Sequence, residues 1–107
     1  MRGTGISART RKVVYERDSI DGRPCCIYCG RPYGIELAHY VSRARGGKGV
    51  ARNLACLCRS CHEALDNGAD MQKAKDIKET FRWWLIKNYS DWKEEEQVVN
   101  KSAAADV

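Results

Sequence analysis

The chain has 107 residues and a net charge of +5 at neutral pH, which suits one small domain. No apolar run is long enough to cross a bilayer, and none follows the basic N-terminus as in an export signal. The sequence therefore predicts neither a membrane protein nor a secreted one. We expect a cytoplasmic protein, in which paired cysteines more often hold a metal than form disulfides.

The charge is distributed unevenly along the chain. Residues 1–62 contain twelve Lys/Arg and four Asp/Glu, a net charge of +8, whereas residues 63–107 contain seven and ten, a net charge of −3. Ten of the twelve basic residues in the first part are arginines, which suit bidentate phosphate contact. An ordinary charged surface is the alternative, but the arginine excess favours a polyanion such as nucleic acid as the partner.

The first predicted element is a helix over residues 8–18. Ser7 is a suitable N-cap, and Val13, Val14 and Arg17 are available for a packed face. A turn over residues 19–24, rich in turn-forming residues, ends this helix.

The middle of the chain predicts a β-hairpin followed by a helix. Residues 35–41 and 54–57 are apolar enough for two short strands, which the polar, glycine-containing loop 42–52 joins. Residues 62–66 are expected to be helical until Asn67 and Gly68 stop the helix. This order of elements predicts an α+β fold in which one helix packs on a compact hairpin.

The remainder of the chain predicts further helices. Apolar residues recur at helical spacing from Asp70, a suitable N-cap, to Tyr89. Trp92 is expected to anchor a short acidic helix over residues 93–98, and the tail 100–107 is expected to be frayed. We expect a single domain over residues 1–107, with a core at about 12–68 and C-terminal helices within 70–99.

Two Cys-x-x-Cys pairs, with 28 residues between them, are the strongest single motif. Cys26 with Cys29, and Cys58 with Cys61, would each fill two adjacent corners of a tetrahedron, so the pairs together predict a closed structural Zn²⁺ site. Buried thiols or disulfides are the alternative. A closed site has no open coordination position, so this metal would hold the fold and perform no chemistry. Of the other two cysteines, Cys56 is expected to be a small apolar strand residue.

Both histidines of the chain lie near the second cysteine pair. His62 directly follows Cys61, and Asp66 lies at i+4 from His62 on the same helical face, as two ligands to one metal ion require. A solvated carboxylate at a helix end is the alternative for Asp66. His39 lies on the first predicted strand.

The loop between the histidines is basic and rich in glycine. Glycine allows a phosphate to approach the backbone, and cationic side chains neutralise its charge. The cationic residues of this loop are Arg43, Arg45, Lys48 and Arg52.

The combined pattern resembles a known family. The segment AHYVSRARGGKGVARNLACLCRSCHEALD is similar to the "His, basic Gly-Gly loop, Asn-Leu, Leu-Cys-x-x-Cys-His" stretch of HNH endonucleases. The resemblance covers residues 12–68 and implies a small ββα-metal (His-Me finger) core with a structural four-cysteine zinc site and flanking helices. It also implies a metal-dependent DNA endonuclease, phage-encoded or from a bacterial host, acting alone, as a homodimer or within larger phage or restriction machinery.

The resemblance implies a role for each motif residue. His39 would be the general base that takes a proton from water, and Asn53 would span the loop and hold the His39 backbone or ring. His62 would ligate one divalent ion (Mg²⁺, Mn²⁺, Ni²⁺ or Zn²⁺) that stabilises the leaving 3′ oxygen. The products would carry 5′-phosphate and 3′-hydroxyl ends.

The chain departs from the family pattern at Ala38. Many members have Asp or His immediately before the base as a second metal ligand, and alanine cannot ligate an ion. The ion would then depend on His62 with Asp66, or on Glu36, which lies on the same strand face as position 38. A weakened or absent catalytic metal is the alternative.

Two further functions compete with the endonuclease hypothesis. One is a non-catalytic zinc-stabilised module that binds nucleic acid through the basic loop. The other is a structural adaptor whose helix over residues 70–88 docks a partner through Trp83 or Trp92, which an exposed apolar patch would favour.

Overall fold

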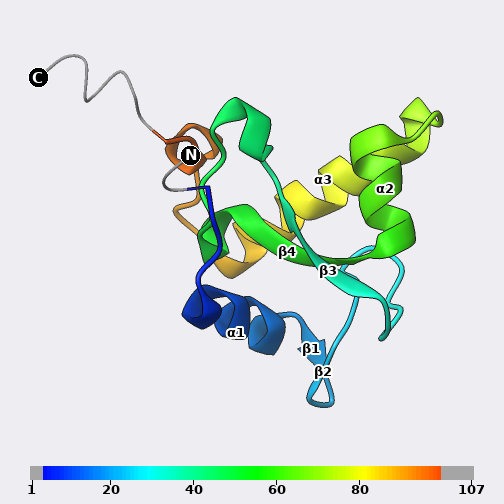
Figure 1. Cartoon of the computed structure of the whole chain (residues 1–107), viewed down its shortest axis with the longest axis horizontal. Coiled ribbons are helices and arrows are strands. Elements are labelled where there is room, and N and C mark those ends of the chain that lie inside the picture. Colours follow the sequence, from blue (N-terminus) through cyan, green and yellow to red (C-terminus); the bar gives the residue numbers. More distant parts are fainter. Residues whose placement is uncertain (1–3, 100–107) are drawn as a thin grey trace, which may run out of the picture.

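A computed structural model of the chain describes residues 4–99. Three α-helices and four short strands form an α+β fold (Figure 1). In chain order the elements are α1 (Ala8–Arg17), β1 (Ser19–Ile20), β2 (Arg23–Pro24), β3 (Ile35–His39), the 3₁₀ helices η1 (Arg43–Arg45) and η2 (Ala51–Asn53), β4 (Leu54–Cys58), α2 (Arg59–Asn67), α3 (Met71–Asn88) and the 3₁₀ helix η3 (Glu94–Gln97).

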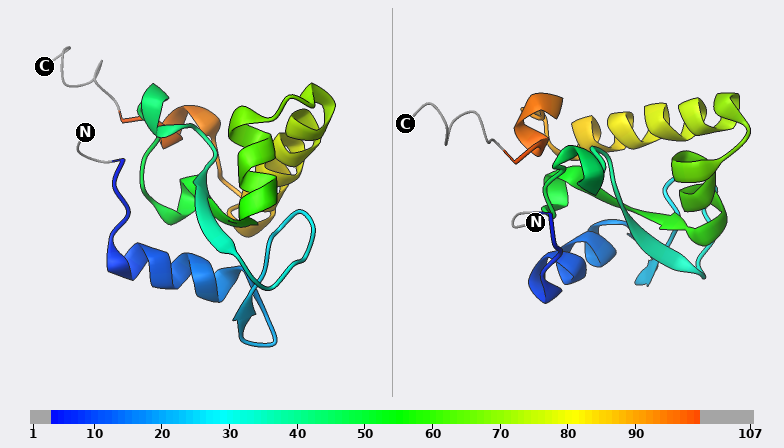
Figure 2. Two further views of the ribbon diagram at one scale, coloured as in Figure 1. Left: turned by 45° about the vertical axis from the view of Figure 1, so that its right-hand side comes forward. Right: turned by 45° about the horizontal axis from the view of Figure 1, so that its top comes forward.

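The central element is the antiparallel pair of β3 and β4. Ile35 pairs with Cys58 at one end and His39 pairs with Leu54 at the other. Figure 2 shows α1 and α3 on opposite sides of this pair. The alternation of side chains along a strand explains the arrangement, because each strand supplies one set of residues to each face.

Each face of the strand pair has its own core. On the α1 side, Val14 packs with Leu54 and Cys56, and all three are fully buried. On the other side, Ala38 and Leu57 belong to the larger core, which α3 completes with Ile77, Phe81 and Leu85 and which also includes Trp92.

The helices confirm most of the sequence prediction. Ser7 caps α1 by accepting a hydrogen bond from the Thr10 amide, and Asp70 caps α3 in the same way at Lys73. Val13 was wrongly assigned to the packed face of α1, since it is 44% exposed. The other two residues predicted for that face, Val14 and Arg17, do face the core.

Several boundaries differ from the sequence prediction, and the predicted turn over residues 19–24 contains the short strands β1 and β2. The first strand ends at His39, not at residue 41, because the amide and carbonyl of Val41 bond to the side chain of Asn53 and not to a strand. Helix α2 begins at Arg59, not at residue 62, so the second cysteine pair spans the end of β4 and the first turn of α2. The acidic segment forms only the short η3. The predicted frayed tail lies outside the described residues.

A buried ion pair joins three elements. Arg17 donates to both oxygens of Asp18 and to the backbone carbonyls of Ala51 and Leu54. Asp18 also accepts from the Cys56 amide and from Nε1 of Trp84 at 2.8 Å. Because every charge has partners, the pair can be buried without a large desolvation penalty, and it fixes α1 and α3 against β4.

The aromatic residues of the adaptor hypothesis lie in different surroundings. Trp92 is buried and donates to the Arg52 carbonyl, so it is closed to a partner. Trp83 is 58% exposed, and Lys87 lies over its ring. Within residues 4–99, no helix combines the length and the apolar character needed to span a membrane.

Candidate nuclease site and metal centre

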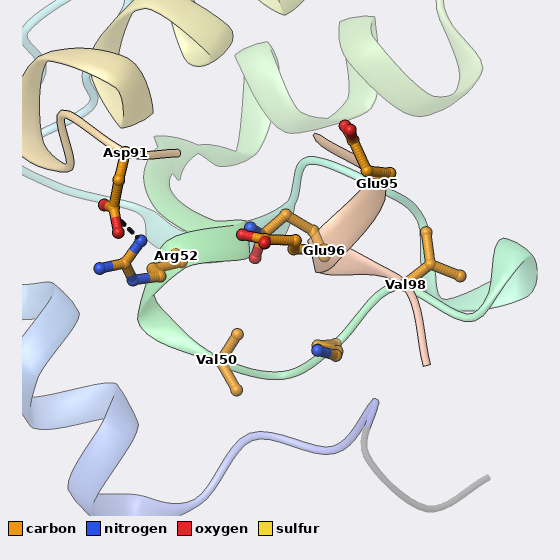
Figure 3. Close-up of a pocket in the computed structure, with 8 residues that line it drawn as sticks. Val50, Arg52, Asp91, Glu95, Glu96 and Val98 are labelled. Atoms are coloured by element: carbon orange, nitrogen blue, oxygen red, sulfur yellow. Dashed lines mark hydrogen bonds and ion pairs between the residues drawn. The ribbon is translucent and has the colours of Figure 1, made fainter. Parts of the chain in front are cut away.

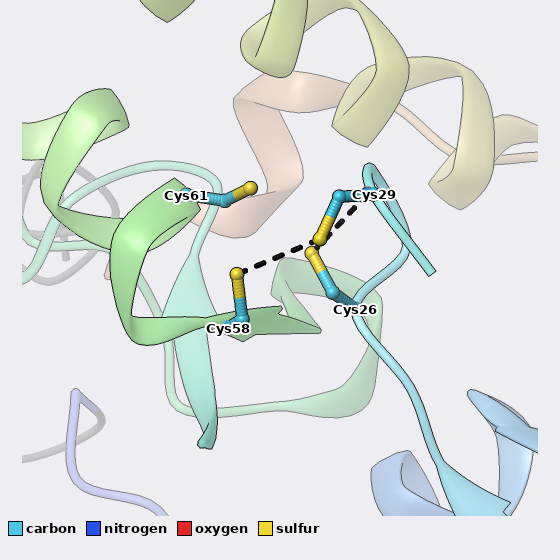
Figure 4. Close-up of side chains that lie close together, drawn as sticks. All are labelled: Cys26, Cys29, Cys58 and Cys61. Carbon is cyan, nitrogen blue, oxygen red and sulfur yellow. Dashed lines mark hydrogen bonds between the residues drawn. The ribbon is translucent and has the colours of Figure 1, made fainter. Parts of the chain in front are cut away.

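The four cysteines of the two Cys-x-x-Cys pairs meet at one point (Figure 4). Their sulfur atoms all lie within 4.8 Å of one another, and the Sγ atoms of Cys29 and Cys58 are 3.6 Å apart. Two corners of a tetrahedron with bonds of about 2.3 Å are separated by about 3.8 Å, so the cluster fits a tetrahedral metal ion. In the described part of the chain, no other group of three or more His, Cys, Asp or Glu side chains gathers in this way.

The ionisation of these thiols also favours a bound cation. Burial raises the pKa of Cys61 far above its ordinary value, and the neighbouring thiols Cys58 and Cys26 raise it further. At Cys26, burial opposes ionisation, but amide donors from Cys29 and Cys58 outweigh it and lower the pKa. Four thiolates this close repel one another, and a divalent cation removes that repulsion.

The other two cysteines lie outside the cluster. Cys56 is fully buried on β4 in the core beneath α1, as the sequence predicted. Cys25 is buried as well, and its thiol donates to the Arg23 carbonyl at 3.2 Å.

His39 is the last residue of β3, and its side chain has a defined protonation pattern. Nε2 lies 2.9 Å from the backbone carbonyl oxygen of Thr4. A carbonyl only accepts hydrogen bonds, so Nε2 carries the proton and donates, and the neutral ring keeps a lone pair on Nδ1. Burial lowers the pKa of His39. The hydrogen bond to the Thr4 carbonyl opposes this decrease, whereas the charge of Arg43 adds to it, and the net pKa is lowered. The ring is therefore neutral at neutral pH and able to accept a proton.

Asn53 is fully buried and closes the loop that follows His39. Its Oδ1 accepts from the Val41 amide at 2.8 Å, and its Nδ2 donates to the carbonyls of Val41 and Lys48. Its backbone carbonyl accepts from the Tyr40 amide. The sequence-based expectation that Asn53 spans the loop agrees with this geometry. The bonds hold residues 40 and 41, next to His39, and not the His39 ring.

His62 lies between two carboxylates. Its Nδ1 is 2.9 Å from Oε1 of Glu36, and its Nε2 is 3.1 Å from Oδ2 of Asp66. Glu36 also accepts from Arg59 at 3.2 Å, and these two neighbours, His62 first, lower the pKa of Glu36. The two carboxylates bond to opposite nitrogens of the ring, so they do not converge on one point. Ala38 is buried in the core and offers no ligand.

A pocket of about 390 Å³ joins the ends of β3 and α2 to α3. His39, Asp66 and Arg45 line it, together with Lys75 and Lys78 of α3. Lys78 donates to the Tyr40 carbonyl, lies 3.8 Å from the centre of the Tyr40 ring, and has a pKa that burial lowers. Sequence reasoning missed both lysines, although the small Ala74 beside them was a signal that this face of α3 packs closely on another element.

The remaining cations of the basic loop face a different groove. A groove of about 840 Å³ is lined by the cations Lys48 and Arg52 and by the carboxylates Asp91, Glu95 and Glu96. Figure 3 shows Arg52 beside Asp91. Arg52 pairs with Asp91 at 2.9 Å, and its guanidinium lies 4.9 Å from the Tyr89 ring centre. The structure therefore divides the four predicted phosphate-binding residues. Arg45 lines the His39 pocket, and Arg43 acts on the pKa of His39, whereas Lys48 and Arg52 face carboxylates.

Comparison with known proteins gives one family match. Residues 26–68 match the model of the HNH endonuclease family. The match includes both cysteine pairs, both histidines and the loop between them, and it leaves out α1 and α3. A search of curated proteins found no match.

Proposed function

Because residues 26–68 match the model of the HNH endonuclease family, we propose that the protein is a metal-dependent DNA endonuclease that hydrolyses phosphodiester bonds. One observation carries the proposal. His39 is a neutral base with a free lone pair on Nδ1, and it lines a pocket that also contains a carboxylate and three cationic side chains. A phosphodiester needs such cations for its charge, and an attacking water needs such a base.

His39 takes the proton from the attacking water in this proposal. Its lowered pKa keeps the ring neutral at working pH, and the bond from Nε2 to Thr4 prevents the ring from turning. Arg45, Lys75 and Lys78 neutralise the phosphate and hold it in the pocket. Asn53 keeps the loop backbone in place, with each of its buried hydrogen bonds contributing about 1 kcal/mol. The products carry 5′-phosphate and 3′-hydroxyl ends.

His62 and Asp66 are the proposed ligands of the catalytic ion. Nε2 of His62 already lies beside Asp66, so these two groups can share one cation. Glu36 then accepts from Nδ1–H and orients the ring, a support common for histidine ligands, and does not bind the ion itself. A divalent ion held here would stabilise negative charge on the phosphoryl oxygens and the leaving 3′ oxygen.

The cysteine cluster is the proposed structural zinc site. Four sulfurs leave no open coordination position, so the ion would link β4 and α2 to the Cys26–Cys29 turn and would not contact substrate. In this scheme the described chain works as one nuclease domain, with α1 and α3 packed on opposite faces of the strand pair.

Plasmid nicking tests the proposal. Supercoiled DNA incubated with the protein and Mg²⁺, Mn²⁺ or Ni²⁺ should become nicked, and His39→Ala should lower the rate about 10²- to 10⁴-fold. DNA binding by the variant, measured by gel shift, should be unchanged. Undiminished cutting by His39→Ala would refute the assigned base.

A zinc-stabilised module that binds nucleic acid without cutting it is the second candidate. It is favoured by Ala38, which supplies no ligand, and by the two carboxylates that bond to opposite sides of His62. It predicts salt-sensitive DNA binding and no cleavage with any of the three metals.

A further inference from the structure

We propose that the N-terminal segment Thr4–Ile6, which precedes the matched residues 26–68, brings one group into the active site: the Thr4 carbonyl positions His39 as an Nδ1 base. The consequence for catalysis depends on the proposed endonuclease activity. The effect of the Thr4 carbonyl on the tautomer of the His39 ring does not depend on that activity. The tautomer and the catalytic effect can therefore be tested separately.

The first support is the contact between segment and ring. The Thr4 carbonyl lies 2.9 Å from Nε2 of His39, and the Thr4 residue is only 1% exposed. The contact joins residues 35 positions apart. A free neutral imidazole exchanges its proton between the two nitrogens, whereas a fixed carbonyl acceptor selects the form protonated on Nε2. Only that form leaves the Nδ1 lone pair free to accept a proton from water.

The second support is the close crossing of this segment over Gly49. A Cβ atom at position 49 would lie 1.9 Å from the Gly5 carbonyl oxygen and 2.9 Å from that of Thr4. Both neighbours are backbone atoms, which cannot move aside as a flexible side chain can. The absence of a side chain at Gly49 therefore allows the segment to lie against the loop, in the position from which Thr4 reaches His39.

The third support is the anchoring of the segment from its other end. Ile6 packs against the core formed by Val14, Leu54 and Cys56, and Ser7 caps α1 directly afterwards. Position and direction of the segment are therefore set by α1, which lies outside the matched residues 26–68. The positioning group for His39 comes from a part of the chain that the family domain does not include.

The tautomer of His39 gives a direct test. Two-bond ¹H–¹⁵N correlation spectra of the ¹⁵N-labelled protein distinguish the two neutral forms of each imidazole, and the chain has only two histidines. Above the pH at which His39 titrates, the intact chain should show His39 protonated on Nε2. A chain without residues 1–5, and the Gly49→Ala variant, should show a mixture of both tautomers.

Gly5→Ala is the matched control. It adds the same methyl group to the same crossing, but a Cβ at position 5 has no atom within 4 Å, so the tautomer should be unchanged. The His62 signals and the zinc content report whether each variant is folded, and the two perturbing variants provide independent tests. In nicking assays, the truncated chain and Gly49→Ala should each lower kcat about 10- to 100-fold, because His39 loses the group that orients it. KM should be unchanged.

The outcomes separate this inference from the proposed function. A pure Nε2–H tautomer in the folded truncated chain or in folded Gly49→Ala overturns the inference, whatever the activity. A mixed tautomer in both variants supports it, even where no variant, nor the intact chain, cuts DNA. In that last case the proposed endonuclease function fails and the positioning contact stands.

Discussion

Cys61 and His62 are neighbours in α2, yet they belong to two different sites. Cys61 is 4% exposed and points into the cluster of four sulfurs, whereas the His62 side chain is 24% exposed between two carboxylates. One residue step in a helix rotates the side chain by about 100°. Cys26, Cys58 and Cys61 are buried in the core and only Cys29 of the cluster is exposed, whereas Asp66, the partner of His62, lines the pocket that also contains Arg45, Lys75 and Lys78.

The difference separates what holds the domain together from what acts on a substrate. A closed set of four ligands leaves a metal no free position, so its contribution is stability. A partly exposed site with imidazole and carboxylate groups can admit substrate, and it contributes little to the core. Changes on the two sides of α2 should therefore have different effects.

The largest effect is expected at the cysteine cluster. Cys58→Ser should abolish both folding and activity, because structural zinc contributes about 10–16 kcal/mol of binding free energy in small domains. That is as large as the whole stability of an average domain, about 5–15 kcal/mol. Zinc content and far-UV circular dichroism measure the loss. Cys25→Ser, a buried thiol outside the cluster, should retain both zinc and fold. A folded, active Cys58→Ser protein would contradict a structural metal.

A smaller effect, confined to activity, is expected at the histidine site. His62→Ala should lower the nicking rate by about 100-fold or more, since a lost metal ligand removes several kcal/mol of charge stabilisation. The melting temperature and zinc content should stay unchanged. Glu63→Ala, at the next position on α2, which is exposed, serves as the control. Unfolding of His62→Ala would show that the two sites are not separable.

DNA affinity should distinguish the two halves of the basic loop. Arg45 lines the His39 pocket and forms no ion pair with any residue in the described range. If Arg45 contacts a phosphate, Arg45→Ala should reduce the slope of the logarithm of the binding constant against the logarithm of the salt concentration by about 0.9. Arg52→Ala should reduce the slope less, because Asp91 already neutralises Arg52. Fluorescence anisotropy of a labelled duplex against salt concentration measures both slopes. Asp91→Asn should strengthen DNA binding, because it removes the charge that neutralises Arg52. Equal slopes for the two arginine variants would show that Arg45 and Arg52 do not differ in their contribution to DNA binding.

The smallest expected effect is a shift in pH dependence. Burial lowers the pKa of His39, so protonation removes the base only at a pH below the ordinary value of about 6.5. The acidic limb of kcat/KM should have its midpoint below that pH. Arg43→Ala removes a positive charge that contributes to the lowering, so it should move the midpoint upward. A limb above pH 6.5 in the unmodified protein would exclude His39 in this environment as the base.

Local patterns in the sequence predicted most of the fold. Ser7 and Asp70 cap α1 and α3 as expected, because capping involves only a few neighbouring residues. The first strand was predicted to end at residue 41 but ends at His39, and the reason lies outside the local sequence. Val41 is apolar enough for a strand, but Asn53, twelve residues later, takes its amide and carbonyl.

By itself, the sequence determined the resemblance of residues 26–68 to the HNH endonuclease family, the α+β fold and the four-cysteine cluster, because residue spacing alone sets the geometry of short motifs. Tertiary structure decided which groups surround the histidines. The Thr4 carbonyl, Lys75 and Lys78 reach His39 or its pocket only through the packing of α1 and α3. The pairing of Arg52 with Asp91 depends in the same way on where the chain returns after α3. These contacts join residues far apart in the sequence, and only the packed core brings them together.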